Sequence, residues 1–119
     1  MLDMKALEAL GVDTSAGLAC CADDPELYEE MLAEYVKESK TNVTDLQRFF
    51  EARDFDNYRI KAHSVKSTSR MIGASALAET AYGLELAGKE RDETKIAAAH
   101  EPFLSAYSSF AERLRELVK

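Results

Sequence analysis

Helical periodicity is the feature that most constrains the fold of this chain. Apolar side chains recur at steps of three and four residues over long stretches, the pattern of a helix with one buried face. The 119 residues include only five Gly and two Pro, and no stretch alternates strictly between apolar and polar residues as a half-buried strand does. The sequence therefore predicts an all-α fold.

Start and stop signals divide the chain into two short helices and four long ones. Asp24 is suited to cap a helix whose first position is Pro25, and the last apolar stripe continues in register through Pro102, so one helix is expected there. The predicted helices cover residues 3–10, a short stretch after Asp13 or Thr14, and about 25–52, 55–71, 75–88 and 96–117. We expect one domain, residues 1–119, with short N-terminal helices in 1–23 and an antiparallel four-helix bundle in 24–119.

Composition argues against several classes of protein. Lys and Arg number 15 against 22 Asp and Glu, a formal charge of −7, which disfavours nucleic acid as a partner. No apolar run approaches the ~20 residues that cross a bilayer, and no basic-then-apolar leader opens the sequence. The only cysteines, Cys20 and Cys21, lie in an apolar stretch, and we interpret them as small buried side chains. We expect a cytoplasmic protein in a reducing compartment, without membrane partners.

One segment places a histidine among basic residues. "RIKAHSVKSTSRMIGA", residues 59–74, has one histidine, four basic residues and no acidic residue. On a helix, Arg59, Lys66, Ser67 and Arg70 share a face with His63, away from the apolar seam. Three cations beside an imidazole favour its neutral, nucleophilic form, and they suit an anion such as a phosphoryl group on the ring, with Lys66 near its oxygens. The alternative is a solvated surface histidine.

The same segment resembles the signature of histidine-containing phosphotransfer (HPt) domains. That signature reads roughly A-H-x-[LV]-K-[GS]-x-x-x-x-x-G-A, and "AHSVKSTSRMIGA" matches it at Ala62, His63, Val65, Lys66, Gly73 and Ala74. The flanking segments follow the order of that family over most of the chain. Ser67 stands where the family most often has glycine, which puts the affinity of docking in doubt.

The resemblance implies a phosphorelay intermediate of two-component signalling. His63 would accept a phosphoryl group, through Nε2, from the phospho-aspartate of one receiver domain and pass it to another. Such a domain is not a kinase and needs no cofactor or metal of its own, because the receiver supplies the Mg²⁺. The implied partners are response-regulator receiver domains and a hybrid sensor histidine kinase, and a monomer suffices. Lys66 would steady the phosphoryl oxygens, Ser67 would allow close approach, and Gly73 would serve the helix-to-helix turn.

Other residues carry weaker hypotheses. Ile60 and Met71 flank the His63 face, and we expect them to form part of an apolar docking patch with Arg59 and Arg70 at its rim. The alternative is that both pack against a neighbouring helix.

One further residue and one acidic cluster are interpreted without a catalytic or metal-binding role. We interpret His100, which has no basic neighbours, as structural or surface. Asp23, Asp24 and Glu26 are better explained by helix capping and the helix dipole than by a metal site.

Three rival functions are weighed against the phosphorelay. The histidine-bearing dimerisation domain of a sensor kinase favours an acidic residue directly after its histidine and a proline five positions on, where this chain has Ser64 and Thr68. A hydrolytic or acid–base enzyme lacks a carboxylate or second histidine placed by spacing alone to complete a relay with His63. The third rival is an adaptor bundle that binds receiver domains or other signalling proteins without being phosphorylated, against which His63 and Lys66 weigh.

Overall fold

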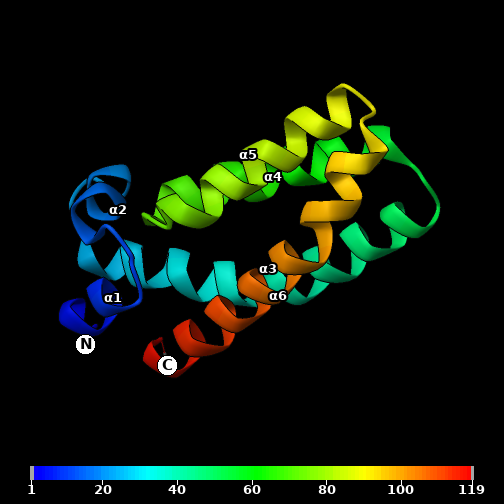
Figure 1. Cartoon of the computed structure of the whole chain (residues 1–119). Helices are drawn as coiled ribbons and strands as arrows, with labels where there is room; N and C mark the ends of the chain where they lie inside the picture. The colour runs from blue at the N-terminus through cyan, green and yellow to red at the C-terminus, as the bar shows by residue number, and fades with distance from the viewer. Residues whose placement is uncertain (1, 119) are drawn as a thin grey trace.

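The computed structural model describes residues 2–118, which form six helices and no strand (Figure 1). The helices are α1 (Met4–Ala9), α2 (Thr14–Cys20), α3 (Pro25–Glu51), α4 (Phe55–Ile72), α5 (Ser75–Lys89) and α6 (Glu93–Leu117). Pro102 lies inside α6, which is a single helix as predicted. The all-α class is confirmed, and the long helices lie close to the predicted ranges, except that α6 begins at Glu93, almost one turn before the predicted start at residue 96.

Aspartate side chains begin five of the six helices. Asp24 shows the pattern: its Oδ1 accepts hydrogen bonds from the backbone N–H groups of Glu26 and Leu27 at 3.0 and 3.4 Å. Caps of this kind satisfy backbone donors that the first turn leaves unpaired, and each contributes about 1 kcal/mol. The five caps are Asp3, Asp13, Asp24, Asp54 and Asp92.

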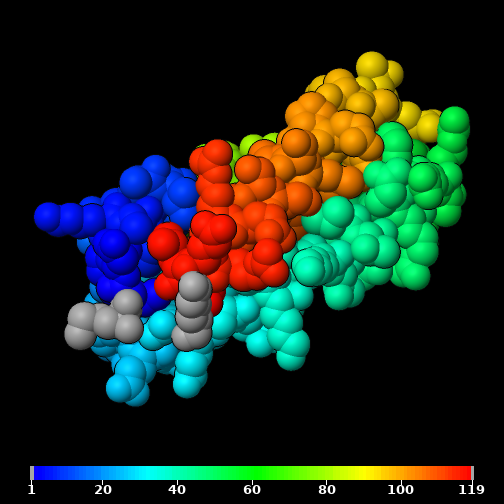
Figure 2. Space-filling view, turned by 90° about the horizontal axis from the view of Figure 1, so that it is seen from below, coloured from blue at the N-terminus to red at the C-terminus, as the bar shows by residue number. Residues whose placement is uncertain are grey.

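The four long helices form a bundle, and the molecule as a whole is elongated, with extents of 42 × 22 × 20 Å. α4 and α5 lie side by side across from α3 and α6, and successive helices run in opposite directions (Figure 1). In Figure 2, which looks onto the α6 side, the red end of α6 lies next to the blue N-terminal helices. The short helices therefore cover one end of the bundle.

The core combines aliphatic residues with fully buried tyrosines whose hydroxyl groups find partners. Tyr28, Tyr58 and Tyr107 are fully buried among residues such as Leu32, Leu46 and Phe103. The Tyr28 hydroxyl donates to the Ile72 carbonyl at 2.8 Å, and Asn42 donates to the Tyr107 hydroxyl at 3.0 Å. Because burying an unpaired hydroxyl is costly, these bonds allow tyrosine to be buried at these two positions.

The N-terminal helices attach to the turn between α4 and α5. The N–H of Asp13 donates to the carbonyl of Gly73 at 2.8 Å, next to the bond from Tyr28 to Ile72. Gly73 ends α4 with φ of 88°, a left-handed conformation that glycine adopts without strain. The predicted turn is thus held from outside by α2 and the start of α3.

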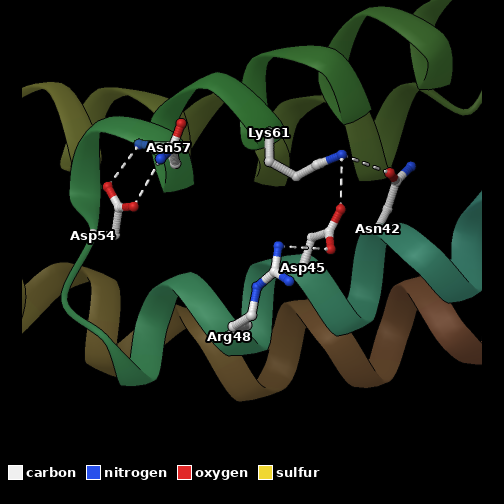
Figure 3. A network of polar contacts seen from close by, with 6 residues as sticks. All are labelled: Asn42, Asp45, Arg48, Asp54, Asn57 and Lys61. Carbon is white, nitrogen blue, oxygen red and sulfur yellow. Dashed lines mark hydrogen bonds and ion pairs between the residues drawn. The ribbon is translucent and has the colours of Figure 1, made fainter.

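A polar network joins α3 to α4 through Lys61, which lies within the segment 59–74 (Figure 3). Lys61 Nζ lies 3.2 Å from Asp45 Oδ2 and 3.3 Å from Asn42 Oδ1, and Arg48 also pairs with Asp45 at 3.3 Å. Lys61 is one of the four basic residues around His63 in the sequence. The network shows that its charge is balanced by α3, on a side of α4 separate from the histidine.

The structure corrects one prediction about the cysteines. Cys21 is buried but Cys20 is exposed, and both are free thiols. Adjacent residues at the end of a helix point about 100° apart, so only one of the two faces the core.

Among residues 2–118, no helix combines the length and the apolar character that crossing a bilayer requires.

His100 is a fully buried part of the core, in agreement with a structural role. Its ring stacks on Phe50 with the centroids 4.0 Å apart. Nδ1 lies 2.8 Å from the Tyr58 hydroxyl and Nε2 lies 2.8 Å from Gln47 Oε1. Because the amide oxygen only accepts, Nε2 carries a proton and Nδ1 accepts from Tyr58, which is the arrangement of a neutral ring.

We expect the protein to lose stability as the pH falls below about 6.5, the ordinary pKa of histidine. Burial lowers the pKa of His100 in the folded state, while the nearby Glu101 and Glu51 oppose this more weakly. Between the folded and unfolded pKa values the unfolded chain binds more protons, so stability is full above the unfolded value and declines below it. Urea unfolding between pH 7.5 and 5.5 measures this decline. The same slope in a His100→Gln variant would contradict the assignment.

Candidate functional site

His63 stands on the outer side of α4, and 57% of its side chain is exposed. Lys66, Ser67 and Arg70 follow it at spacings of three, four and seven residues, which places them along the same face of the helix. α5 runs antiparallel beside that face. The site is therefore built where the two helices meet.

α5 contributes a carboxylate that the sequence reasoning missed. Glu85 Oε2 lies 2.8 Å from His63 Nδ1. Spacing alone did not place a carboxylate near the histidine, but the fold does. The missed signal was the turn at Gly73: His63 and Glu85 are nearly equally far from it in sequence, so an antiparallel helix pair brings them together.

Lys66 is the third member of a cluster with His63 and Glu85. Its ammonium lies 2.7 Å from Glu85 Oε1, and the residue is only 8% exposed. One carboxylate therefore contacts both the histidine ring and the lysine, one through each oxygen. The positive charge of Lys66 is thus paired with Glu85, a contact that the sequence reasoning did not include when it counted three free cations around the ring.

The charge of Glu85 determines which nitrogen of His63 is free. Burial by itself raises the pKa of Glu85, but its contacts with Lys66 and His63 outweigh this, so the pKa lies below the usual value. An ionised carboxylate only accepts hydrogen bonds, hence Nδ1 must donate. A neutral ring with its proton on Nδ1 has its lone pair on Nε2. Within residues 2–118, the hydrogen bond to Glu85 is the only one that the His63 ring makes.

The arrangement supports a nucleophilic Nε2. When Nε2 forms a bond to an electrophile, the ring becomes positively charged, and the carboxylate at Nδ1 stabilises that charge without moving a proton. Glu85 also restricts rotation of the ring, so Nε2 keeps one direction. The site can thus accept a group at Nε2 and release it again.

The remaining predicted site residues differ in their exposure and in their position relative to the histidine. Ile60 is 55% exposed, so it does not pack in the core as the alternative required. Arg70 is exposed and Ser67 half-buried beside His63, while Arg59 is half-buried and packs on Gly88. Met71 is 39% exposed. It lies farther round α4, at a small hollow shared with Met31 and Thr68.

Two exposed apolar residues of α5 were not foreseen. Tyr82 and Leu86 are each 39% exposed and, one helical turn apart, share a face of α5. Glu85 lies between them in sequence and points to His63. Exposed apolar residues therefore flank the histidine on both helices, with Ile60 on α4 and Leu86 on α5.

Five surface hollows among residues 2–118 are lined by residues other than His63. One surface hollow is lined by Phe50, Phe55 and Glu93, and another by Leu2, Met4 and Pro25, among others. Neither includes His63. Because small-molecule sites are typically concave, an exposed imidazole where α4 and α5 meet suits a partner protein that brings its own active site.

Comparison with known proteins agrees with this geometry. The family model described as "Hpt domain" matches residues 30–118, more than half of the chain, and the match includes His63, Lys66, Gly73 and Glu85. It begins within α3, so α1 and α2 precede it. Searches of the curated proteins and of the solved structures found no match. With an all-helical bundle and a family match of this length, the chain belongs to the Hpt domain family.

Proposed function

We propose that this protein is a phosphorelay intermediate that accepts a phosphoryl group on His63 from the aspartate of one receiver domain and passes it to another. Membership of the Hpt family implies phosphotransfer in two-component signalling by a module that is not a kinase. The family does not identify the partners. Receiver domains, a hybrid sensor kinase as their source, and Mg²⁺ supplied by the receiver belong to the proposal.

The observation that carries the proposal is the contact between Glu85 and Nδ1 of the exposed His63. In the transfer, the Nε2 lone pair attacks phosphorus, the bond between phosphorus and the aspartyl oxygen breaks, and the aspartate leaves as a carboxylate. Nδ1 keeps its proton and Glu85 balances the positive ring. The return step reverses these bonds, so the same contact serves both directions.

The partner has to dock around the histidine, and Ile60 provides a test of that surface. We expect Ile60→Ser to weaken receiver binding by about tenfold, as loss of an apolar contact worth about 1.4 kcal/mol would, with the free energy of unfolding unchanged within about 0.5 kcal/mol because the side chain is exposed. Titration calorimetry and urea unfolding measure the two quantities. A clear loss of stability with normal binding would assign Ile60 to the fold instead.

The direct test of the function is phosphorylation. The protein is incubated with several phosphorylated receiver domains and Mg²⁺, and the product is examined for a phosphate that is labile in acid and stable in alkali, as phosphohistidine is. Peptide mapping then identifies the residue. We expect the phosphate on His63, and we expect it to move to an unphosphorylated receiver added afterwards.

The adaptor hypothesis makes the opposite prediction. An adaptor binds receivers but takes no phosphate from any of them. Binding without labelling, by a protein shown to be folded, would therefore overturn the proposal and assign the face around His63 to docking alone.

A further inference from the structure

An exposed aromatic ring on α5 stands beside two cations of the His63 face. The Lys66 ammonium lies 5.0 Å from the centroid of the Tyr82 ring, and the Arg70 guanidinium carbon lies 5.8 Å from it. Both distances fall within the ~6 Å over which the face of an aromatic ring attracts a cation. One side chain of α5 thus contacts two consecutive cations of α4.

The position of Lys66 is unusual for a lysine. Lysines normally lay their alkyl stem along the surface and extend the ammonium into water, but Lys66 is only 8% exposed. Its ammonium lies between the Glu85 carboxylate and the Tyr82 ring. Glu85 supplies the counter-charge, and Tyr82 occupies a direction in which the ammonium would otherwise turn toward solvent.

Arg70 has fewer constraints than Lys66. It is exposed, and within residues 2–118 it takes part in no ion pair with a carboxylate. Contact with Tyr82 therefore keeps this exposed guanidinium on the side of α4 where His63 lies. A planar guanidinium stacks on aromatic rings more readily than an ammonium does, which suits this less buried position.

We propose that Tyr82 is a positioning residue for phosphotransfer, holding Lys66 and Arg70 on the His63 face so that two positive charges are in place when the phosphoryl group arrives. This inference rests on the proposed function. Tyr82 acts through the two cations and does not touch the reacting atoms. Its aromatic ring, not its hydroxyl, is the part that matters.

Substitutions at Tyr82 separate the ring from its other properties. Tyr82→Leu removes the ring but keeps an apolar side chain, Tyr82→Phe keeps the ring, and Leu27→Ala removes an equally exposed apolar side chain from α3. The transfer rate at saturating receiver and the receiver Kd are measured separately. We expect Tyr82→Leu to slow transfer about three- to tenfold with the Kd unchanged, and the other two variants to behave as the unmodified protein.

A second measurement does not depend on phosphotransfer. NMR of ¹⁵N-labelled protein follows the Lys66 ammonium, whose signal is visible when contacts slow its proton exchange with water. The signal is expected in the unmodified protein and in Tyr82→Phe, and is expected to broaden or vanish in Tyr82→Leu. A merely structural role for Tyr82 would not make the ammonium signal depend on the ring.

The outcomes distinguish the inference from the function on which it rests. An unchanged rate in Tyr82→Leu overturns the inference, and so does a weaker Kd with an unchanged rate, because Tyr82 would then be a docking contact. If the unmodified protein takes phosphate from no receiver, the proposed function fails. Even then, the Lys66 ammonium signal tests whether Tyr82 holds Lys66. Loss of the signal in Tyr82→Leu but not in Tyr82→Phe supports this role, and survival of the signal in Tyr82→Leu overturns it.

Discussion

Replacing His63 with glutamine is expected to abolish phosphoryl labelling by a phosphorylated receiver while the bundle remains folded. Glutamine has no ring nitrogen to attack phosphorus, but its amide can still donate to Glu85. Because more than half of the His63 side chain is exposed, the free energy of unfolding should change by no more than about 0.5 kcal/mol. Labelling and urea unfolding of the same preparations measure both effects.

His100 supplies the matched control, since it is the other histidine of the chain. His100→Gln removes a buried ring that stacks on Phe50 and bonds to Tyr58 and Gln47, and should cost about 1–3 kcal/mol of stability. Labelling should persist in this variant under conditions where it is folded. Labelling that persists in His63→Gln would instead show that another residue carries the phosphate.

Gly73→Ala should produce the largest loss of stability among single substitutions at the turns. An alanine at φ of 88° is strained, at about 1–2 kcal/mol, and its Cβ would collide with the backbone carbonyl of Asp13. Relief requires α2 to move away and the bond from Asp13 to Gly73 to break. We expect a total loss of about 3 kcal/mol or more in urea unfolding.

Gly11→Ala measures the backbone strain in the absence of the collision. Gly11 has nearly the same φ, 89°, but an added Cβ would meet nothing within 4 Å. This variant should lose only the strain contribution of about 1–2 kcal/mol. Equal losses at Gly11 and Gly73 would show that α2 yields freely and does not hold the turn between α4 and α5.

The sequence contained most of the fold because the signals for a helix are local. Caps such as Asp24, the proline after it and the glycine at position 73 act within a few residues of where they stand, so the bounds of the long helices could be predicted closely. The prediction from residue type was wrong at Cys20, which is exposed. Residue type indicated that both cysteines are buried, but only the neighbouring helices decide which side of a short helix is covered.

The candidate site divides in the same way. His63, Lys66 and Arg70 lie on one helix, and the helical repeat alone placed them on a common face. Tyr82, Glu85 and Leu86 lie on α5, and no short-range sequence pattern indicates that they are close to the histidine on α4. The residues that contact the His63 ring and the Lys66 ammonium from α5 were therefore missed, although the histidine proposed as the phosphoryl acceptor could be singled out from the sequence.

The sequence by itself determined the helices, their order and the residue proposed to carry the phosphate, because these depend on contacts within one turn or on one matched motif. Only the tertiary structure decided which charged side chains form pairs with one another. Packing α5 against α4 pairs Glu85 with His63 and Lys66, whereas packing α3 against α4 assigns Lys61 to Asp45. Electrostatic contacts act over a few ångströms in space, and only the packed bundle converts separation along the chain into that distance.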